Sequence, residues 1–202
     1  MGQAQRRGAR RRAPAAAARD RCDPDARGAR VVTVPDEFRF CPRCATALVR
    51  GVYGERERSA CPACGWIHWD NPTPVVAAVI EYEGKVFLAR NAAWPEGRFA
   101  LVTGFLERDE SPRDAVIREV KEETQLDALD ARLIGVYDFA LRNQVIIAYH
   151  VPAQGEVRLN EELVEYRLIE PAKVRVWPRG TGFALADWLR ARGHEVHFVP
   201  LP

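Results

Sequence analysis

Short apolar runs and turn signals alternate through the middle of the chain. Residues 75–82 are mostly β-branched or small apolar residues, Glu83-Gly84 is typical of a turn, and residues 85–90 form a second apolar run. This pattern predicts a β-hairpin, because two extended runs joined by a tight turn pair as antiparallel neighbours. A further extended segment is predicted at residues 99–107.

A helix is predicted directly after this segment. Ser111 is a good N-cap, Pro112 suits the first helical position, and Asp114 occupies the capping-box position. Val116 and Val120 then form an apolar stripe, together with their apolar neighbours. We expect this stripe to pack on a sheet.

The second half of the chain repeats the same alternation. Residues 131–140 and 144–153 read as two strands, and residues 161–171 begin acidic and continue extended. Residues 180–193 are predicted to be a helix that stops at Gly193, with one side formed by Leu185, Trp188 and Leu189. The order of elements predicts the α/β class, with a mixed sheet flanked by helices.

The polar side of the first helix is unusually acidic. Glu119, Glu122 and Glu123 lie within one arc of ~100°, because each residue turns the helix by about 100°. A set of carboxylates on one side suits a hard divalent cation, Mg²⁺ or Mn²⁺. The alternative is a solvated acidic face, and helical spacing alone does not decide between the two.

The composition is that of an ordinary globular protein, but its charge is unevenly placed. The 202 residues are 47% hydrophobic, and no apolar run approaches the ~18 residues that a membrane span needs. Residues 1–30 contain nine Arg and three Asp, a net charge of +6, so residues 31–202 carry 21 basic and 25 acidic groups, a net charge of −4. A cytoplasmic location and no contact with membranes are expected.

The basic segment has almost no large apolar residues. It is predicted to be a disordered tail over residues 1–35, since it cannot bury enough surface to offset the entropy of ordering. An extension without function and an arm that binds nucleic acid are both open readings of it, and the first is favoured. Cys22 lies in this tail and is assigned no role.

The other four cysteines form two C-x-x-C pairs separated by sixteen residues: Cys41, Cys44, Cys61 and Cys64. This spacing predicts a tetrahedral zinc site of four thiolates, with hairpin strands between the pairs, the fold called a zinc ribbon. Two disulfides are the alternative, which a cytosolic compartment disfavours. The ribbon is predicted to span residues 36–72, where Zn²⁺ supplies much of the folding energy, and a second domain to span residues 73–202.

The role of the ribbon is left open between structural support and binding of nucleic acid or protein. Its run "GERERSA" mixes charges rather than forming a basic patch, which favours a structural role. His68 follows the last cysteine closely, but four thiolates already complete a zinc site. It is therefore expected to be a surface or packing residue.

The acidic helix and the loop before it resemble the Nudix box of the Nudix hydrolases. That pattern is Gly, five residues, Glu, seven residues, Arg-Glu, an aliphatic residue, any residue, Glu-Glu, any residue, Gly and an aliphatic residue. Residues 104–126 match eight of its nine specified positions. The departure is Gln125, which stands where the pattern has a glycine that follows the helix end. A left-handed conformation there would cost glutamine about 1 kcal/mol.

The resemblance extends over about residues 40–189 to the zinc-ribbon branch that includes the NADH pyrophosphatases. It implies an α/β/α sandwich, a structural Zn²⁺, and a hydrolase that uses Mg²⁺ or Mn²⁺ to cleave the pyrophosphate of a nucleoside diphosphate linked to another group. The branch carries a Ser-Gln-Pro-Trp-Pro-Phe-Pro stretch soon after the box, whereas this chain has "YDFALRNQVII". ADP-ribose or a similar compound is therefore at least as well supported as NADH.

The resemblance also implies roles for residues of the box. Glu119 and Glu123 are expected to be the main ligands of the divalent cation, with Glu122 as a further ligand and the backbone carbonyl of Thr103 as another. Glu119 also serves as a base in some members of the family. Arg118 and Glu110 match the positions that support the loop by ion pairing, and Gly104 is expected to permit a tight backbone turn.

Residues beyond the box could complete the site. A later acid contributes in some members of the family, and Glu162 is preferred here over Glu161 and Glu165, although each could equally be a solvated loop charge. Phe105 and Phe139 are candidates to contact the nucleobase, as is Tyr137, but core packing is the alternative for each.

Three functions follow as expectations. The first is the metal-dependent hydrolase, acting on a nucleotide-type small molecule. The second is a non-catalytic Nudix module that binds nucleotides or nucleic acid, which would not need to keep the acidic residues. The third is an enzyme that processes capped RNA 5′ ends, with the basic tail holding RNA. Relatives with a ribbon also suggest a homodimer.

Overall fold

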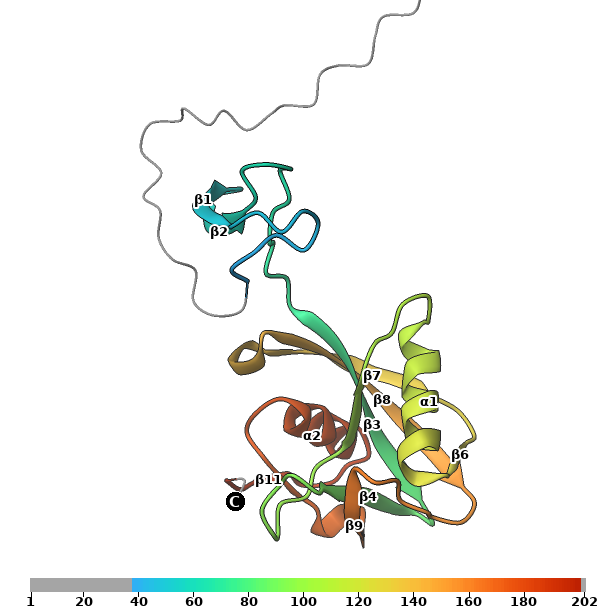
Figure 1. Ribbon diagram of the computed structural model, residues 1–202. Helices are drawn as coiled ribbons and strands as arrows, with labels where there is room; N and C mark the ends of the chain where they lie inside the picture. Colours follow the sequence, from blue (N-terminus) through green and yellow to red (C-terminus); the bar gives the residue numbers. More distant parts are fainter. Residues whose placement is uncertain (1–37, 201–202) are drawn as a thin grey trace, which may run out of the picture. The chain divides into compact units, whose positions relative to one another are not determined.

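The computed structural model describes residues 38–200, so the predicted basic tail and Cys22 lie outside the described residues. The contacts divide the chain into two compact units between Asp70 and Asn71, two residues before the predicted boundary (Figure 1). Each unit has its own core. Within residues 38–200, no helix is long and apolar enough to cross a membrane.

The first unit is built around a small hairpin, as predicted. Strands β1 (Val49–Tyr53) and β2 (Arg56–Ala60) pair antiparallel. Gly54 and Glu55, which join them, both have positive φ, at 57° and 65°. Two such residues in a two-residue loop match the twist of paired strands. The core is small, and it consists of Cys41, Leu48 and Cys61 with Trp66 packed against them.

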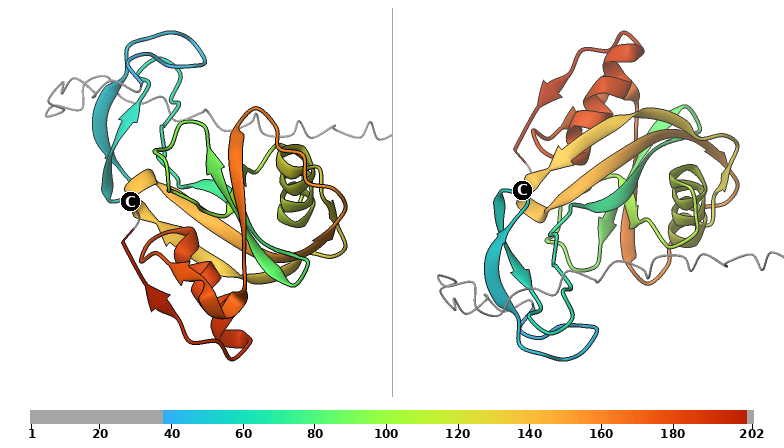
Figure 2. Two further views of the ribbon diagram at one scale, coloured as in Figure 1. Left: turned by 90° about the horizontal axis from the view of Figure 1, so that it is seen from below. Right: turned by 90° about the horizontal axis from the view of Figure 1, so that it is seen from above.

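The second unit is a curled mixed sheet with a helix on each side (Figures 1 and 2). Its two central strands, β3 (Thr73–Tyr82) and β8 (Gln144–Gln154), run parallel over ten residue pairs. The other edge of β3 pairs with β5 (Val102–Phe105) at one end and with β4 (Lys85–Asn91) at the other, both antiparallel.

The remaining strands extend this sheet at both edges. Strand β9 (Leu163–Ile169) continues it beyond β4, and β7 (Arg132–Phe139) and β6 (Asp127–Ala128) pair with the free edge of β8. Elements too short to be recognised in the sequence are η1 (Ala140–Arg142), η2 (Pro171–Lys173), β10 (Arg175–Val176) and β11 (His197–Phe198). The predicted extended segment at 99–107 contains only the four residues of β5 as a strand.

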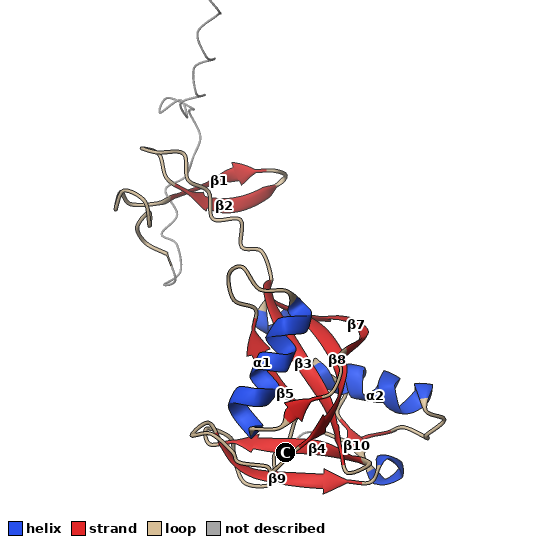
Figure 3. Cartoon of the chain, turned by 90° about the vertical axis from the view of Figure 1, so that its right-hand side faces the viewer, coloured by secondary structure: helices blue, strands red, loops and turns tan. Residues whose placement is uncertain are grey.

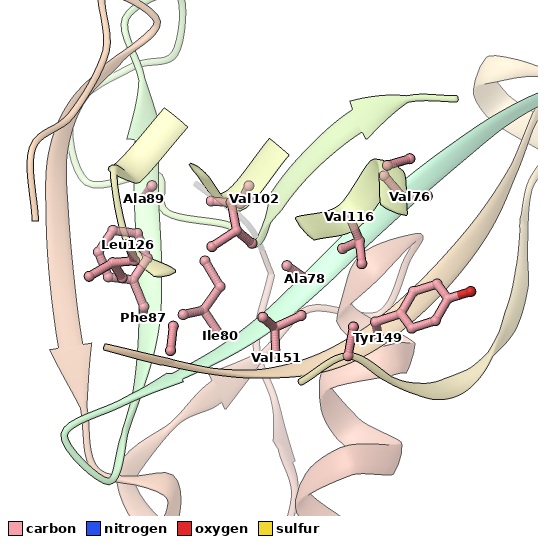
Figure 4. Close-up of a cluster of buried hydrophobic side chains, with 14 of the residues drawn as sticks. Val76, Ala78, Ile80, Phe87, Ala89, Val102, Val116, Leu126, Tyr149 and Val151 are labelled. Carbon is pink, nitrogen blue, oxygen red and sulfur yellow. The ribbon is translucent and has the colours of Figure 1, made fainter. Parts of the chain in front are cut away.

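Helix α1 (Pro112–Thr124) covers one face of the sheet, and its apolar stripe forms the first core (Figure 4). Val76 and Ala78 of β3 contribute to this core, and Val116 and Val120 of α1 pack against it as predicted. All four side chains are almost completely buried. The alternation of a strand thus directs every second residue of β3 toward α1.

Helix α2 (Thr181–Ala191) covers the opposite face (Figure 3). Val79 of β3 lies in this second core with Leu185, Trp188 and Leu189, the three residues predicted to share one side of the helix. Because β3 is buried on both faces, its sequence is a continuous apolar run rather than an alternating one. The predicted α/β/α sandwich is confirmed.

The ends of α1 follow the predicted capping chemistry. Ser111 Oγ accepts a hydrogen bond from the backbone N–H of Asp114 at 3.1 Å, and Pro112 begins the helix. Gln125 follows the last turn with φ 61° and ψ 5°, and its N–H donates to the carbonyl of Lys121. The left-handed conformation predicted for this position is confirmed, although the residue has a Cβ.

Replacing Gln125 by glycine should therefore stabilise the protein, because glycine adopts this conformation without a steric cost. We expect Gln125→Gly to be about 0.5–1 kcal/mol more stable than Gln125→Ala in equilibrium urea unfolding. The alanine variant is the matched control, since it removes the same side chain but keeps the Cβ. Equal stability of the two variants would contradict a strained helix end.

Candidate active site and zinc centre

The four cysteines of the two C-x-x-C pairs converge in the first unit. Their sulfur atoms all lie within 4.8 Å of one another, with Sγ–Sγ distances of 3.5 Å for Cys41–Cys64 and 3.4 Å for Cys44–Cys61. All four cysteines are free, so the alternative of two disulfides is not realised. A tetrahedron of thiolates around Zn²⁺, with Zn–S bonds of ~2.3 Å, needs this kind of convergence. The donor set therefore fits a structural zinc ion.

His68 is a packing residue, as expected. Its ring lies 4.7 Å from the ring of Phe38 and is stacked on Trp66 at 5.9 Å between centroids. Its backbone N–H donates to the carbonyl of Ser59 at 2.8 Å. His68 thus helps to close the small core beside the cysteines.

The second unit contains a cleft of about 570 Å³ at one end of its sheet. Its wall combines β5, the polar side of α1, the start of β8 and three loops. Carboxylates line it together with arginines and aromatic rings: Glu107, Glu119, Glu122, Glu123, Glu162, Arg98, Arg118, Arg142, Arg179, Trp94, Phe105, Phe139 and Trp177. Chain segments far apart in sequence therefore meet around the acidic helix.

Arg118 connects the helix to the loop and the strand before it. Its guanidinium donates to both oxygens of Glu110, at 3.1 and 2.8 Å, and to the carbonyl of Phe105 at 3.3 Å. Its Nη1 donates to Glu119 at 2.8 Å and to Glu122 at 3.0 Å. The bonds from Arg118 hold the pKa of Glu110 below its usual range. The geometry is thus that of a planar fork that fixes several carboxylates at once.

The side chain of Glu119 packs directly against the backbone of Gly104. A Cβ added at Gly104 would be 1.8 Å from Cδ of Glu119 and 1.9 Å from its Oε1. Gly104 itself is part of β5 and does not have a positive φ. The expectation that glycine is needed here for a tight turn is therefore wrong. Glycine is needed because the Glu119 carboxylate occupies the space of a side chain.

Glu123 is a buried carboxyl among other acids. Its exposed fraction is 8%, and burial together with the charges of Glu119, Glu162 and Glu122 raises its pKa to about 8. The pKa of Glu119 is also raised, mainly by burial, although Arg118 opposes the shift. Gathered acids with raised pKa values are typical of functional sites, because the fold holds charges that repel one another.

These carboxylates suit a divalent cation by chemistry, but they do not yet surround one point. Within residues 38–200, the four thiolates are the one set of ligand atoms close enough to hold a metal ion. Glu119 and Glu122 instead both accept hydrogen bonds from Nη1 of Arg118. Oxygen-only donors are the ligands that Mg²⁺ and Mn²⁺ prefer. Thr103, whose carbonyl was a predicted ligand, lines the same cleft.

Among the late acids, the fold brings Glu162 alone to the cleft. Asn160 holds it there: its Oδ1 accepts from the N–H of Glu162 at 3.0 Å, and its own N–H donates to the carbonyl of Glu123 at 3.2 Å. Glu161 is exposed and does not line the cleft. Glu165 is paired with Arg90 at 3.2 Å, also away from the cleft.

Of the three aromatic residues predicted as candidates to contact the nucleobase, two line the cleft and one does not. Phe105 lines the cleft and is 60% exposed, so its ring is available to a ligand. Phe139 lines the cleft too, but it also packs against Ile146 and its neighbours in the sheet. Tyr137 does not line the cleft and donates its hydroxyl hydrogen to Asp187 at 2.9 Å.

Three arginines and two tryptophans of the cleft were not predicted as site residues: Arg98, Arg142, Arg179, Trp94 and Trp177. They come from the β4–β5 loop, from η1 and from the segment before α2. No motif spacing connects these segments, so the sequence carried no signal that they share a wall with the acidic helix.

Comparison with protein families finds two matches that divide the chain. Residues 71–190 match the family model described as NUDIX domain, and residues 39–70 match the one described as Nudix N-terminal. The acidic helix and its cleft lie within the first match. The four cysteines lie within the second.

The matches to curated relatives cover about half of each relative's length. The protein named NAD-capped RNA hydrolase NudC of Pseudomonas fluorescens (strain Pf0-1) is 28% identical over 139 residues, which are 68% of this chain and 49% of that protein. The protein of the same name from Vibrio atlanticus (strain LGP32) is 28% identical over 112 residues, 55% of this chain and 41% of that protein. The chain thus spans about half the length of the curated relatives it matches.

Solved structures share the fold. A NUDIX hydrolase from Nitrosomonas europaea superposes with a TM-score of 0.67 at 24% identity, covering 81% of this chain and 99% of that one. An ADP-ribose pyrophosphatase from Streptococcus suis 89-1591 superposes with a TM-score of 0.51 at 25% identity, covering 64% of this chain and 100% of that one.

Gly104→Ala should disturb the site while leaving the sheet in place. The added methyl group would displace the Glu119 carboxylate from its position on β5, so we expect Mn²⁺ affinity at the cleft to fall by ~10-fold or more. Isothermal titration calorimetry measures this affinity. Gly135→Ala is the control, because it lies on β7 of the same sheet and the nearest contact of its Cβ would be the side-chain end of Tyr137, at 3.0 Å. Equal affinities for the two variants would contradict the proposed reason for Gly104.

The raised pKa of Glu123 predicts the direction of a pH effect. Its folded value of about 8 exceeds its usual 4.5, so its contribution to stability is complete below pH 4.5 and is lost as the pH rises toward 8. We expect the Tm of protein without Mg²⁺ to fall over this range and added Mg²⁺ to restore it near the upper end. Glu123→Gln should flatten the fall, because an amide does not titrate. Thermal unfolding with the zinc ion retained measures Tm at each pH. If Tm falls as steeply with pH in Glu123→Gln as in the wild type, Glu123 does not cause the fall.

Proposed function

This chain belongs to the Nudix family, and from that premise we propose that it hydrolyses the pyrophosphate bond of nucleoside diphosphates linked to a second group. ADP-ribose, NADH and similar compounds are the substrate class. The observation that carries the proposal is the buried Glu123 within an acidic cluster that lines a cleft large enough for a nucleotide. Burying Glu123 beside Glu119, Glu122 and Glu162 lowers the stability of the fold when these acids are charged, because like charges repel one another.

Glu119, Glu122 and Glu123, with the Thr103 carbonyl, would hold the divalent cations, Mg²⁺ or Mn²⁺. Bound there, the cations would polarise the phosphoryl group and make water a better nucleophile. Glu123 would join this ligand set as a carboxylate, and the cations would offset the repulsion between the acids of the cluster.

The protein's own groups position this cluster. Arg118 and Glu110 tie α1 to the loop and to β5, so the carboxylates stay aligned with the cleft. Glu119 would hold the cations in place of its hydrogen bond to Nη1 of Arg118, while the two bonds to Glu110 keep the guanidinium in place. Glu162 accepts the proton of the attacking water. The water oxygen bonds to phosphorus, and the bond from that phosphorus to the bridging oxygen breaks, which leaves two phosphate monoesters.

Processing of capped RNA 5′ ends is a second candidate function. The matched relatives of Pseudomonas fluorescens and Vibrio atlanticus are named NAD-capped RNA hydrolase, which favours this function. The chemistry would be the same, because an NAD cap contains the same pyrophosphate linkage. The difference lies in what binds the RNA body, for which the basic residues 1–30 are the candidate segment.

The first experiment is a cleavage assay with the purified chain, with Mg²⁺ or Mn²⁺. The substrates are ADP-ribose, NADH, NAD⁺, FAD, CoA, diadenosine polyphosphates and an NAD-capped RNA. We expect cleavage at the pyrophosphate bond, with ¹⁸O from labelled water in one phosphate product. Glu119→Gln and Glu123→Gln should each lower kcat by ~100-fold or more, since both remove charge that the reaction requires.

Glu161→Gln is the matched control for Glu162→Gln, because the two residues are neighbours and Glu162 alone lines the cleft. We expect activity near wild type for the first and a clear loss of kcat for the second. Failure of a folded, zinc-loaded chain to cleave any of these compounds would overturn the proposal. Cleavage of capped RNA alone, lost on deletion of residues 1–30, would favour the second candidate. The cytoplasmic location and the homodimer stay predictions.

A further inference from the structure

The hairpin of the first unit separates charges that are mixed in the sequence. Along β2, Arg56 and Arg58 alternate with Glu57. Successive residues of a strand point to opposite faces, so both arginines lie on one face of the hairpin and the glutamate lies on the other. Among the charged residues of β1 and β2, this first face therefore carries arginine and no acid. The mixed run that favoured a structural role is thus sorted by the fold.

Two aromatic residues accompany these arginines. Tyr53 is directly opposite Arg56 in the register of the hairpin, and residues paired in this way share a face. Trp69 comes from the segment after β2 and lies beside Arg58. The Arg58 guanidinium is 4.9 Å from the centre of the Trp69 ring, and its Nε donates to the carbonyl of Trp69 at 3.4 Å. We call Tyr53, Arg56, Arg58 and Trp69 the ribbon face.

The side chains of the ribbon face are accessible and are held in place. Trp69 is 49% exposed, Arg56 is exposed, and Tyr53 and Arg58 are half-buried. Arg58 also donates to the carbonyl of Tyr53, so it connects the end of β1 to Trp69. Gly51 leaves room for the Tyr53 ring, because a Cβ there would lie 2.9 Å from Cε2 of that ring. A ligand would therefore meet groups already in position, which lowers the entropic cost of binding.

Rings and arginines side by side match the chemistry of a single-stranded nucleic acid. Unpaired bases stack on aromatic rings, and the phosphates between them bind arginine. An acidic peptide would pair with Arg56 and Arg58 but would not use the rings. An apolar partner would bury both charges without an acceptor, which is costly. A duplex keeps its bases stacked on one another, so it would offer this face its backbone alone.

We propose that the ribbon face binds the single-stranded RNA body of a capped substrate. Bases stack on Tyr53 and Trp69, and Arg56 and Arg58 contact the phosphates. The choice of RNA rests on the second candidate function above, whereas the binding itself requires neither cleavage nor the cations of the cleft. The ribbon face acts in addition to the basic residues 1–30, and the zinc centre holds the hairpin that carries it.

Fluorescence anisotropy with a labelled, uncapped 12-nucleotide RNA tests this surface without turnover. The zinc-loaded chain is used at full length and again without residues 1–30, so that any binding by the basic segment is measured separately. We expect Trp69→Leu to weaken RNA binding by ~5-fold or more in both, since it removes a stacking ring, and Trp69→Phe to retain most of the affinity. Val52→Ala is the matched control, because Val52 is 75% exposed and lies opposite Glu57, on the other face of the hairpin.

The salt dependence of binding tests the arginines. Each phosphate contact of a single strand contributes about 0.7 to the slope of log K against log salt. Arg56→Gln should lower the slope by about this amount, whereas Arg56→Lys should keep it because the charge remains. A duplex RNA of the same length should bind ~10-fold more weakly than the single strand or worse. Zinc content and far-UV circular dichroism show that each variant is folded.

The outcomes separate this proposal from the hydrolase proposal. RNA binding that depends on Trp69, with no cleavage of any compound, would support the ribbon face and overturn the hydrolase function. Cleavage of ADP-ribose or NADH by a chain that does not bind RNA would overturn the ribbon face alone. Equal losses in Trp69→Leu and Val52→Ala, equal binding of duplex and single strand, tighter binding of DNA of the same sequence, or binding of polyglutamate as tight as that of RNA would also overturn it.

Discussion

The candidate active site depends on the contact between α1 and β5. Glu119 lies where a side chain of residue 104 would be, so the helix and the strand approach each other through a glycine. Arg118 then joins both elements to Glu110 in the connecting loop. These contacts connect strand, loop and helix, and the Glu119 carboxylate is held between the backbone of Gly104 and the guanidinium of Arg118. A site built on such elements keeps its geometry better than one built on loops.

The same contact explains the electrostatics of the cleft. Once α1 is drawn against β5, Glu123 is buried beside Glu119 and within the field of Glu162, and its pKa rises to about 8. Arg118 offsets part of this repulsion, but its donors are shared among three carboxylates. The resulting excess of negative charge stabilises little in the fold itself. Under the proposed function, this negative charge would bind the cations that in turn bind an anionic substrate, which is why we connect the charge with function.

The two parts of the chain reach stability in different ways. The second unit buries both faces of β3 between two helices, so its stability comes from apolar packing. The first unit has only a few buried side chains around its cysteines, which is too small a core to be stable without the metal ion. The zinc centre thus replaces a hydrophobic core.

Local chemistry was readable from the sequence, because it depends on residues close together along the chain. The period of the apolar residues, the Ser111 cap, the left-handed end at Gln125 and the acidic arc of α1 all follow from spacing within one or two turns. The spacing of the two C-x-x-C pairs also predicted that their four sulfur atoms lie close together. What only the tertiary structure decided were contacts between distant segments: the reason for Gly104, the position of Glu162 in the cleft, and the meeting of Arg98 and Trp94 with the acidic helix. These depend on how the sheet curls and how its loops return to one end, and spacing along a chain does not encode distances across a fold.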